Sequence, residues 1–500
     1  MIELSAGDIA AITGGELIDG AAEETHVEGP VEFDSRKIAP GSIFMALPGA
    51  TVDGHDYVAA AGEQGAALAI VGRPVGYPAL LAPASQRAAG TDNSAVFGAD
   101  DEGYGAAVLA AVDKLARHNT DVLADEESMV VVGITGSAGK TSTKDLIGAL
   151  LGDLGETVAP PGSFNNEIGL PYTALRASRG TKFLVSEMSA RGVGHIAHLA
   201  TITPPKIGVE LNVGSAHLGE FGSREAIAQA KGELVEALPA AEDGGIAILN
   251  ADDDAVIAMR HRTRARVVTF ALDERSKTGE QADYWASDIR LDEVARASFR
   301  LHHPYGEPVD IRLGVFGAHQ VSNALAAAAV AVESGMLPAS VARVLGNHVA
   351  ASANRMDVRT RADGATIIND SYNANPESMR AGIDALAYTA GGRPEANSWA
   401  VLGQMGELGE ESAEEHTELG KFLGTRGIDH AVIVGTGVNQ RAIADAAREH
   451  GVDTRSVEDV DAAVNFVDQH VKPKDVVLVK ASYSDGLWAV AEGLLADEGA

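Results

Sequence analysis

The segment at residues 129–154 constrains the fold of this chain more than any other feature of its sequence. An apolar run of strand length, residues 129–132, leads into the glycine-rich stretch GITGSAGKT at residues 133–141. A helix-length segment with leucine and isoleucine on one face follows. Strand, glycine loop and helix in this order form the context of a phosphate-binding loop. The segment therefore predicts a site for a nucleoside triphosphate.

Each position of this loop has a chemical role. Gly136 and Gly139 let backbone N–H groups turn toward the phosphates with no Cβ in the way. Lys140 adds a positive charge for the β- and γ-phosphates, and the Thr141 hydroxyl is a Mg²⁺ ligand. The remaining predicted contacts in the loop are Ser137, Ala138 and Ser142.

The loop departs from the strict pattern at one position. The pattern has glycine five positions before Gly139, where Ile134 stands, and Gly133 comes one residue early. A glycine turn that merely contains Gly-Lys-Thr is the alternative interpretation. The chain contains no Asn-Lys-x-Asp guanine motif, which disfavours a GTPase switch.

Short apolar runs alternate with helix-length segments from residue 129 to residue 353, and the alternation begins again after residue 355. Alternation of this kind favours parallel sheets with helices on both faces, so two series indicate two α/β domains. The first hundred residues read as a smaller mixed α/β unit. We expect three domains, at residues 1–101, 102–353 and 354–500.

The composition excludes several classes of function. The 39 Lys and Arg residues against 71 Asp and Glu give a net charge of −32, which disfavours nucleic acid and anionic membrane surfaces as partners. The chain has no cysteine, so it has no disulfide, thiolate metal site or cysteine nucleophile. No stretch approaches the roughly 18 to 20 apolar residues that span a bilayer. The N-terminus lacks a secretory signal pattern, and we expect a cytoplasmic protein.

Two residues at strand ends and one lysine are further candidates. Glu187 follows the apolar run at residues 183–185 after one intervening residue, and it is either a metal ligand or a solvated acid. His217 follows the next strand and either binds an ion or phosphate or is a core histidine. Lys231 lies on the apolar face of a predicted helix at residues 223–238, where it must snorkel, pair or be modified.

Taken together, the motifs resemble the Mur ligases, which assemble the peptide stem of the bacterial cell-wall precursor. The central motifs are the phosphate loop, EMS at 187–189, NVGSAH at 212–217, FGS at 221–223, AKGE at 230–233 and GAHQVSNA at 317–324. DSR at 34–36, GSIFMALPG at 41–49 and DGH at 53–55 are similar to the uridine-nucleotide-binding N-terminal domain. FNNEIGLP at 164–171, DSYNANPESM at 370–379 and LGQMGELG at 402–409, with His416, resemble the branch that uses D-alanyl-D-alanine.

The resemblance implies the fold and the reaction. It implies a UDP-sugar-binding N-terminal domain, a central P-loop ATPase domain with a mostly parallel sheet, and a Rossmann-like C-terminal domain. The implied enzyme is an ATP-dependent ligase that joins D-alanyl-D-alanine to UDP-N-acetylmuramoyl-tripeptide through an acyl phosphate, releasing ADP and phosphate. Lys140 would hold the transferring phosphate, Thr141 and Glu187 would hold Mg²⁺, and His217 a second Mg²⁺. The resemblance also implies that Lys231 is carbamylated and binds metal.

Residues outside the loop receive roles from the same resemblance. Arg355 would reach an ATP phosphate and Asp370 the nucleotide, across the cleft between the last two domains. Asn250 is an expected adenine contact. Considered alone, these three residues would be a surface salt bridge, a turn acid and a strand-end cap. Ser35 and Arg36 are expected to bind the uridine diphosphate, because an arginine fork suits a diphosphate. The expected contacts of the peptide substrate are Asn165, Asn166, Tyr372 and Asn373.

Three positions depart from the family pattern. Asn369 stands where the family has the first of two acids, and Gln404 stands where an acid is common. Residues 480–483 read KASY, so that Tyr483 replaces an arginine of the family's KGSR.

Two other hypotheses compete with this function. One is a ligase for a different amino acid, such as the folate-polyglutamating relatives, although the segments at 165–169 and 371–376 argue against it. The other is a nucleotide-regulated binding protein that hydrolyses ATP slowly and ligates nothing. We expect a monomer, and the third residue of the peptide stem, diaminopimelate or lysine, is left open.

Overall fold

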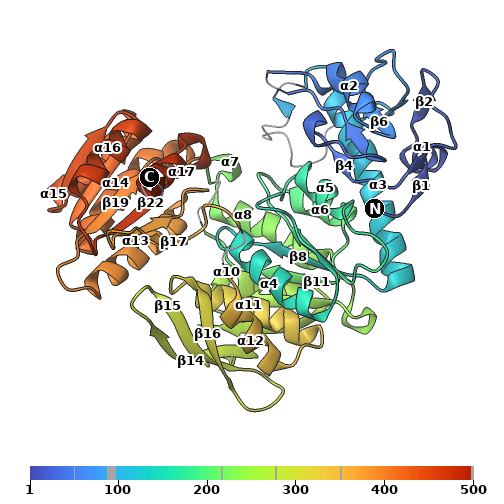
Figure 1. Ribbon diagram of the computed structural model, residues 1–500. Helices are drawn as coiled ribbons and strands as arrows, with labels where there is room; N and C mark the ends of the chain where they lie inside the picture. The colour runs from blue at the N-terminus through green and yellow to red at the C-terminus, as the bar shows by residue number, and fades with distance from the viewer. Residues whose placement is uncertain are drawn as a thin grey trace.

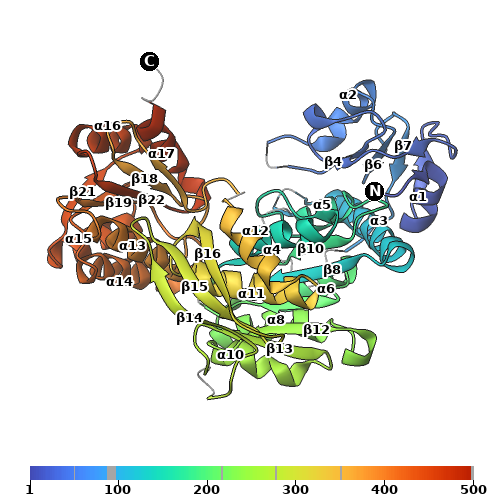
Figure 2. The same cartoon turned by 60° about the horizontal axis from the view of Figure 1, so that its bottom comes forward.

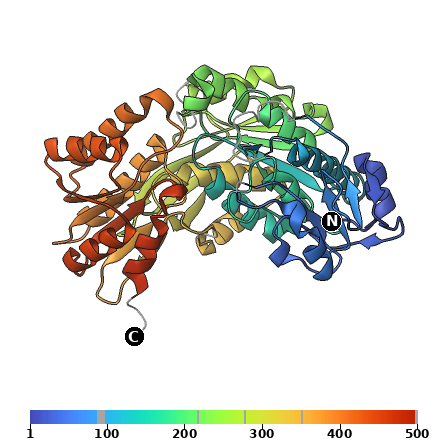
Figure 3. The ribbon, with the colours of Figure 1, turned by 90° about the horizontal axis from the view of Figure 1, so that it is seen from above.

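The computed structural model describes residues 1–49, 51–86, 97–98, 100–214, 218–275, 279–349 and 352–496. The strands near the N-terminus and those near the C-terminus lie on opposite sides of a central part, as Figure 1 shows. The same arrangement is seen from two further directions in Figures 2 and 3. Within the described residues, no helix is long and apolar enough to cross a membrane.

The N-terminal part is built on a five-stranded sheet of order β2-β7-β6-β5-β4. Its strands are β2 (Glu16–Ile18), β4 (Val31–Glu32), β5 (Ile43–Met45), β6 (Leu68–Val71) and β7 (Ala79–Leu81). All neighbours are parallel except β2 and β7. The short strands β1 (Leu4–Ser5) and β3 (His26–Val27) pair separately, and the helices are α1 (Ala6–Thr13) and α2 (Val58–Glu63).

Helix α3 (Tyr104–Glu127) joins this part to the central one. Half of its 24 residues are buried. They pack against α1 and β6 on one side and against α5 (Gly169–Ala174) and α6 (His195–Ile202) on the other. One hydrophobic cluster therefore runs from Ile43 and Leu80 in the N-terminal sheet, through α3, to Leu199 in α6.

The central part contains a nine-stranded sheet of order β16-β15-β14-β13-β12-β11-β8-β10-β9. Its first strands are β8 (Val130–Thr135), β9 (Thr157–Val158), β10 (Phe183–Glu187), β11 (Ile207–Glu210) and β12 (Ile246–Asn250). The others are β13 (Arg266–Ala271), β14 (Tyr284–Leu291), β15 (Arg296–His302) and β16 (Val309–Phe316). The expected strands at 183–185, 207–213 and 246–249 are present, but β11 already ends at Glu210.

The pairing is parallel from β9 to β14 and antiparallel from β14 to β16. The expectation of a mostly parallel central sheet is therefore confirmed. The principal helices of this part are α4 (Lys140–Leu154), α8 (Arg224–Lys231), α9 (Glu233–Glu236), α10 (Asp254–Ile257), α11 (Gln320–Glu333) and α12 (Pro338–Asn347). Helix α11 packs on α4, and its nine residues from Ala324 to Val332 are small or branched apolar side chains buried in the core.

The C-terminal part has a six-stranded sheet of order β17-β18-β22-β19-β20-β21. The strands are β17 (Asp357–Thr360), β18 (Thr366–Asn369), β19 (Ser398–Leu402), β20 (His430–Val434), β21 (Asp453–Val457) and β22 (Val476–Lys480). Only β17, at the edge, is antiparallel among the described strands of this sheet. The helices are α13 (Pro376–Gly391), α14 (Ser412–Thr425), α15 (Val438–Glu449), α16 (Val460–His470) and α17 (Trp488–Leu495). Separate hydrophobic clusters on its two faces give the expected doubly covered α/β sheet.

The C-terminal part meets the central part at a backbone contact between two short helices. These are α7 (Leu218–Phe221) and the 3-10 turn η6 (Gly409–Glu411). A Cβ atom on Gly219 would lie 2.5 Å from the backbone nitrogen of Gly409. Neither of these two segments can therefore carry a side chain at the contact unless the backbone moves. Nearby, the Arg191 guanidinium lies 3.1 Å from the carboxylate of Glu407.

The buried side chain of Asn119 in α3 provides a stability test. Its Oδ1 accepts from the backbone N–H of Ile2 at 2.9 Å, and its Nδ2 donates to the carbonyls of Ala174 and Ala177, both at 3.1 Å. We expect Asn119→Leu to lower the free energy of unfolding by about 2–4 kcal/mol, because it leaves buried backbone groups without partners. Urea unfolding followed by circular dichroism measures the change.

The control is Asp125→Ala, on the exposed side of the same helix. It should shift the free energy of unfolding by less than about 0.5 kcal/mol. An equal effect of the two substitutions would contradict a special role for the Asn119 contacts.

Candidate active site

The phosphate loop lies between β8 and α4, and its conformation is held by a residue from a neighbouring strand end. The Asn212 side chain accepts a hydrogen bond from the N–H of Ala138 at 2.8 Å and donates one to the Ala138 carbonyl at 3.0 Å. The backbone carbonyl of Asn212 accepts from the N–H of Ser137 at 3.0 Å. The loop is therefore fixed in place by protein contacts alone.

Gly139, at the end of the loop, must be glycine on two counts. Its φ of +85° lies in the left-handed region, where a side chain is strained. A Cβ atom there would also lie 2.7 Å from Oδ1 of Asn323 in α11. Gly139 therefore allows the loop to turn directly into α4.

Lys140 and Thr141 are the first two residues of α4. The Lys140 ammonium donates to the Gly136 carbonyl at 2.6 Å. Burial lowers the pKa of Lys140, and the carboxylate of Glu187 opposes that effect. The Thr141 hydroxyl donates to Oε1 of Glu187 at 3.3 Å, and this same oxygen accepts from Nδ2 of Asn165 at 2.8 Å. The second oxygen of Glu187 is buried and has no hydrogen-bond partner among the described residues.

A second acid and lysine lie deeper in the site. Lys231 ends α8 with 5% of its surface exposed, and Glu210 ends β11 with none. Burial, followed by the positive charge of Lys140, lowers the pKa of Lys231, whereas the charge of Glu210 raises it. Burial likewise raises the pKa of Glu210, whose two carboxyl oxygens have no hydrogen-bond partner within the described ranges. The Lys231 side chain is thus buried rather than snorkelling to the surface.

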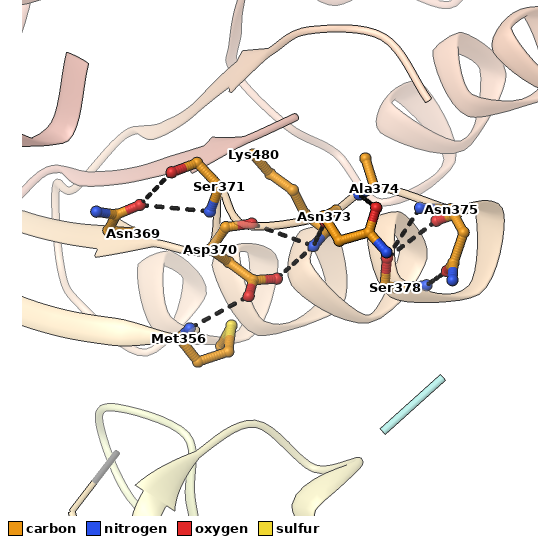
Figure 4. Close-up of polar contacts among 9 residues, drawn as sticks. All are labelled: Met356, Asn369, Asp370, Ser371, Asn373, Ala374, Asn375, Ser378 and Lys480. Carbon is orange, nitrogen blue, oxygen red and sulfur yellow. Dashed lines mark hydrogen bonds and ion pairs between the residues drawn. The ribbon is translucent and has the colours of Figure 1, made fainter. Parts of the chain in front are cut away.

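Asp370 and Lys480 organise the loop that follows β18, as Figure 4 shows. The Lys480 ammonium lies 2.5 Å from Oδ2 of Asp370 and donates to the Asn373 carbonyl at 3.0 Å. Oδ1 of Asp370 accepts from the N–H of Met356 at 3.2 Å. Burial lowers the pKa of Lys480, and Asp370 opposes it. The loop from Asp370 to Asn373 is thereby fixed around a buried ion pair.

Asn369 and the cap of helix α13 hold the two ends of this loop (Figure 4). Asn369 accepts hydrogen bonds from both the N–H and the hydroxyl of Ser371, at 3.3 and 2.6 Å. Asn375 and Ser378 form a capping box at the start of α13. Asn369 therefore has a structural role that an amide fulfils without the acid found in the family.

Arg355 connects the C-terminal part to the phosphate loop. Its guanidinium lies 4.3 Å above the ring of Tyr372 and donates to the hydroxyl of Ser163 at 3.0 Å and of Thr141 at 3.3 Å. Ser163 Oγ is in turn 2.8 Å from Thr141 Oγ1. A positive charge from beyond residue 352 thus reaches the threonine expected to bind metal.

These groups surround one cavity of about 440 Å³. Of the residues that the sequence singles out, its walls contain Ser137, Ala138, Gly139, Lys140, Thr141, Asn165, Asn166, Glu187, Arg355, Tyr372 and Asn373. Tyr483 also lines it, with its ring 5.5 Å from that of Tyr372. The structure therefore brings together most of the predicted site from segments more than 200 residues apart in the sequence.

Other predicted residues lie outside the cavity wall. These are Gly136, Ser142, Lys231, Asn250, Asp370, Ser35 and Arg36. The Asn250 amide donates to the Leu211 carbonyl at 2.7 Å and accepts from the N–H of Asp252, which is a strand-end arrangement. Arg36 has an 87% exposed side chain that pairs with Asp34 in the N-terminal part. His217 lies outside the described residues.

The sequence predicts no role for Asn212, Ser163 or Arg191. In the structure, Asn212 binds the phosphate loop, and Ser163 and Arg191 line the cavity. Asn212 stands inside a quoted motif and follows a strand, which is the signal that could have drawn attention to it. Ser163 and Arg191 have no comparable local signal. No group of three or more His, Asp or Glu side chains suited to a metal is found in the described part of the chain.

Three family models match the chain. The model of the Mur ligase family, catalytic domain, matches residues 30–117. The Mur ligase middle domain matches residues 134–331, and the Mur ligase glutamate ligase domain matches residues 354–483.

Curated relatives and solved structures agree with these models. The UDP-N-acetylmuramoyl-tripeptide–D-alanyl-D-alanine ligase of Mycobacterium tuberculosis is 50% identical over 100% of this chain and 99% of its own length. The Escherichia coli enzyme of the same name is 32% identical over 91% and 90%. A crystal structure of MurF from Acinetobacter baumannii has a TM-score of 0.81 at 28% identity and covers 99% of both chains. MurF ligase from Thermotoga maritima in complex with ADP has a TM-score of 0.73 at 29% identity, covering 94% and 97%.

The geometry of Gly139 gives a prediction for nucleotide binding. We expect Gly139→Ala to weaken the binding of an ATP analogue by at least about 10-fold, because a left-handed backbone at a residue with a Cβ costs about 1–3 kcal/mol. Isothermal titration calorimetry measures the dissociation constant.

Gly152→Ala is the matched control in the same helix, since an added Cβ there meets no atom within 4 Å. It should leave the dissociation constant unchanged within about 2-fold and stabilise α4 slightly. Equal binding by the two variants would show that the loop tolerates a side chain at residue 139.

Proposed function

Because this chain belongs to the Mur ligase family, we propose that its cavity joins two substrates through an acyl phosphate. The chain is an ATP-dependent ligase that couples D-alanyl-D-alanine to UDP-N-acetylmuramoyl-tripeptide in peptidoglycan synthesis. The observation that supports the mechanism is the meeting of Lys140, Glu187 and Arg355 around one cavity. A carboxylate is a poor electrophile, so phosphorylation is needed before an amine can displace an oxygen from it.

In the first step, the terminal carboxylate of the tripeptide attacks the γ-phosphate of ATP. Lys140 holds the phosphate, and Arg355, which donates to the Thr141 hydroxyl, adds a second positive charge. Since Arg355 comes from the C-terminal part, closure of that part on the central one completes the charge around the phosphate. Closure also shields the acyl phosphate from water.

The residues near Thr141 fit a bound Mg²⁺. Glu187 has a buried carboxyl oxygen with no hydrogen-bond partner among the described residues, and Thr141 offers a hydroxyl beside it. Oxygen atoms of this kind are the ligands that Mg²⁺ prefers. We propose that Thr141, Glu187, His217 and carbamylated Lys231 hold Mg²⁺. When bound, the metal would neutralise charge on the phosphates.

The surroundings of Lys231 support carbamylation. Only a neutral amine reacts with CO₂, and the lowered pKa of Lys231 increases the neutral fraction. The modification would replace a buried cation with a carboxylate-like ligand. It would also remove the repulsion between Lys231 and Lys140.

We propose a set of contact residues for each substrate. Asn165, Asn166, Tyr372 and Asn373 line the cavity and are proposed contacts of the peptide substrate. We propose that Ser35 and Arg36 bind the uridine diphosphate. Asp370 and Asn250 are proposed contacts of the nucleotide.

Three further proposals concern the whole chain. We propose domain boundaries at residues 1–101, 102–353 and 354–500, because each of the three larger sheets lies within one of these ranges. We propose a monomer, because one chain supplies every wall of the cavity. We propose the cytoplasm as the compartment, because ATP is available there.

A phosphate-release assay tests the function. We expect rapid phosphate release only when ATP, the UDP-linked tripeptide and D-alanyl-D-alanine are all present. Release that does not depend on the dipeptide would favour a nucleotide-regulated protein. Release with glutamate instead of the dipeptide would favour a folate-type ligase. Repeating the assay with diaminopimelate-containing and lysine-containing tripeptides identifies the third stem residue.

The carbamate proposal gives a separate prediction. We expect Lys231→Ala to reduce turnover by at least about 100-fold, because removing one transition-state charge contact costs about 2.7–4 kcal/mol. Adding bicarbonate should raise the activity of the intact enzyme, with sodium chloride at equal ionic strength as control. Intact-protein mass spectrometry at neutral pH should detect the added CO₂. Near-normal turnover of the variant would exclude the carbamate role.

A further inference from the structure

A buried acid and histidine line the cavity beside the asparagine segment, and the reaction as described does not use them. Oε2 of Glu167 lies 3.3 Å from Nε2 of His195, and 3% of each side chain is exposed. Both residues belong to the cavity wall. Neither ring nitrogen of His195 forms a hydrogen bond to any residue that the structure describes. His195 therefore lines the cavity with two ring nitrogens that could form hydrogen bonds to a ligand.

The backbone around this pair is fixed by helix ends. The carboxylate of Glu233 accepts from the N–H groups of Gly194 and Ala197, at 2.6 and 2.9 Å, which holds the start of α6 and therefore His195. The Asn166 side chain accepts from the N–H groups of Ile168 and Gly169, which holds the start of α5 next to Glu167. A rigid pair of this kind is suited to receive a group in one orientation.

Other charged groups near the pair are already engaged. One turn along α6, Nε2 of His198 lies 3.2 Å from Oδ2 of Asp113 in α3, and neither residue lines the cavity. Arg191 lines the cavity and pairs with Glu407. Among the described residues near Glu167, His195 alone combines a cavity position with ring nitrogens that make no hydrogen bond.

The pair lines the same cavity as the phosphate-binding groups. Asn165, two residues before Glu167, donates to Glu187 in the phosphate-binding part of the cavity. Lys140, Arg355 and Glu187 of that part are assigned above to the phosphates and Mg²⁺, so an incoming amine must be received by other groups. The amine of an incoming dipeptide is an ammonium ion at neutral pH, and it needs an acidic wall to approach and a base to accept its proton. Glu167 and His195 are an acid and a base in the wall of this cavity.

We propose that Glu167 and His195 receive the ammonium group of D-alanyl-D-alanine, with Glu167 attracting the cation and His195 accepting its proton. This inference rests on the ligase function proposed above. The proton passes from nitrogen to His195 and leaves a neutral amine. The amine nitrogen forms a bond to the acyl carbon, and the bond between that carbon and the phosphate oxygen breaks. The second proton lost from nitrogen leaves with the phosphate, so that an amide, inorganic phosphate and a protonated histidine result.

Hydroxylamine provides a test, because its nitrogen is unprotonated at neutral pH and needs no base. With ATP and the UDP-linked tripeptide, it converts the acyl phosphate to a hydroxamate, whereas D-alanyl-D-alanine gives the amide. We expect His195→Gln to lower the ratio of amide rate to hydroxamate rate by about 100-fold, the usual contribution of a general base. Both products are separated and quantified by liquid chromatography and mass spectrometry.

His198→Gln is the matched control, since it changes the same side chain three residues along the same helix but outside the cavity. Its ratio should stay within about 2-fold of the intact enzyme. Glu167→Gln should lower the ratio and raise the KM for the dipeptide, and it decides the question if His195→Gln does not fold.

The outcomes separate the two proposals. A selective loss of amide supports the role of the pair. An unchanged ratio, or an equal fall in both products, overturns it and leaves the pair a structural one. If the intact enzyme forms neither product from the UDP-linked tripeptide, the ligase function itself fails.

Discussion

The desolvation of cationic side chains is the constraint on which the arrangement of this site depends. Lys231 and Lys480 are buried, Lys140 is half-buried, and burial lowers the pKa of all three. A cation removed from water is stable only next to an anion or strong acceptors. Asp370 provides the anion for Lys480 within the protein, and this ion pair shapes the loop after β18. Around Lys140, the missing negative charge is that of a polyphosphate, which explains how a chain of net charge −32 accepts anionic substrates.

The cavity is assembled by parts of the chain that meet through few contacts. Arg355 reaches Ser163 and Thr141, Arg191 pairs with Glu407, and two glycines touch backbone to backbone. None of these interactions buries a large apolar surface, so the C-terminal part can separate from the central part at low cost. The same contacts specify the closed arrangement, because each one requires the partner in its correct position.

Much of the architecture could be predicted because it is encoded locally. The strand, loop and helix around Lys140 have a short-range pattern, and the alternation after residue 129 determines a parallel sheet. The antiparallel strands β14 to β16 were not anticipated, since their partners are fixed by tertiary contacts. The position of Asn212 after a strand marks it as a candidate, but its contact with a loop 74 residues earlier in the chain depends on the tertiary fold. Asn250 was expected to contact adenine, but in the structure its side chain forms hydrogen bonds to the backbone at a strand end.

Helix α3 has a consequence for how this molecule comes apart. Three large sheets divide the described chain into an N-terminal, a central and a C-terminal part. One continuous hydrophobic cluster nevertheless joins the N-terminal sheet to helices of the central part through α3. The C-terminal sheet has clusters of its own. Cooperative units of folding follow shared cores rather than sheets. We therefore expect the N-terminal sheet to lose its structure together with helices α5 and α6 of the central part.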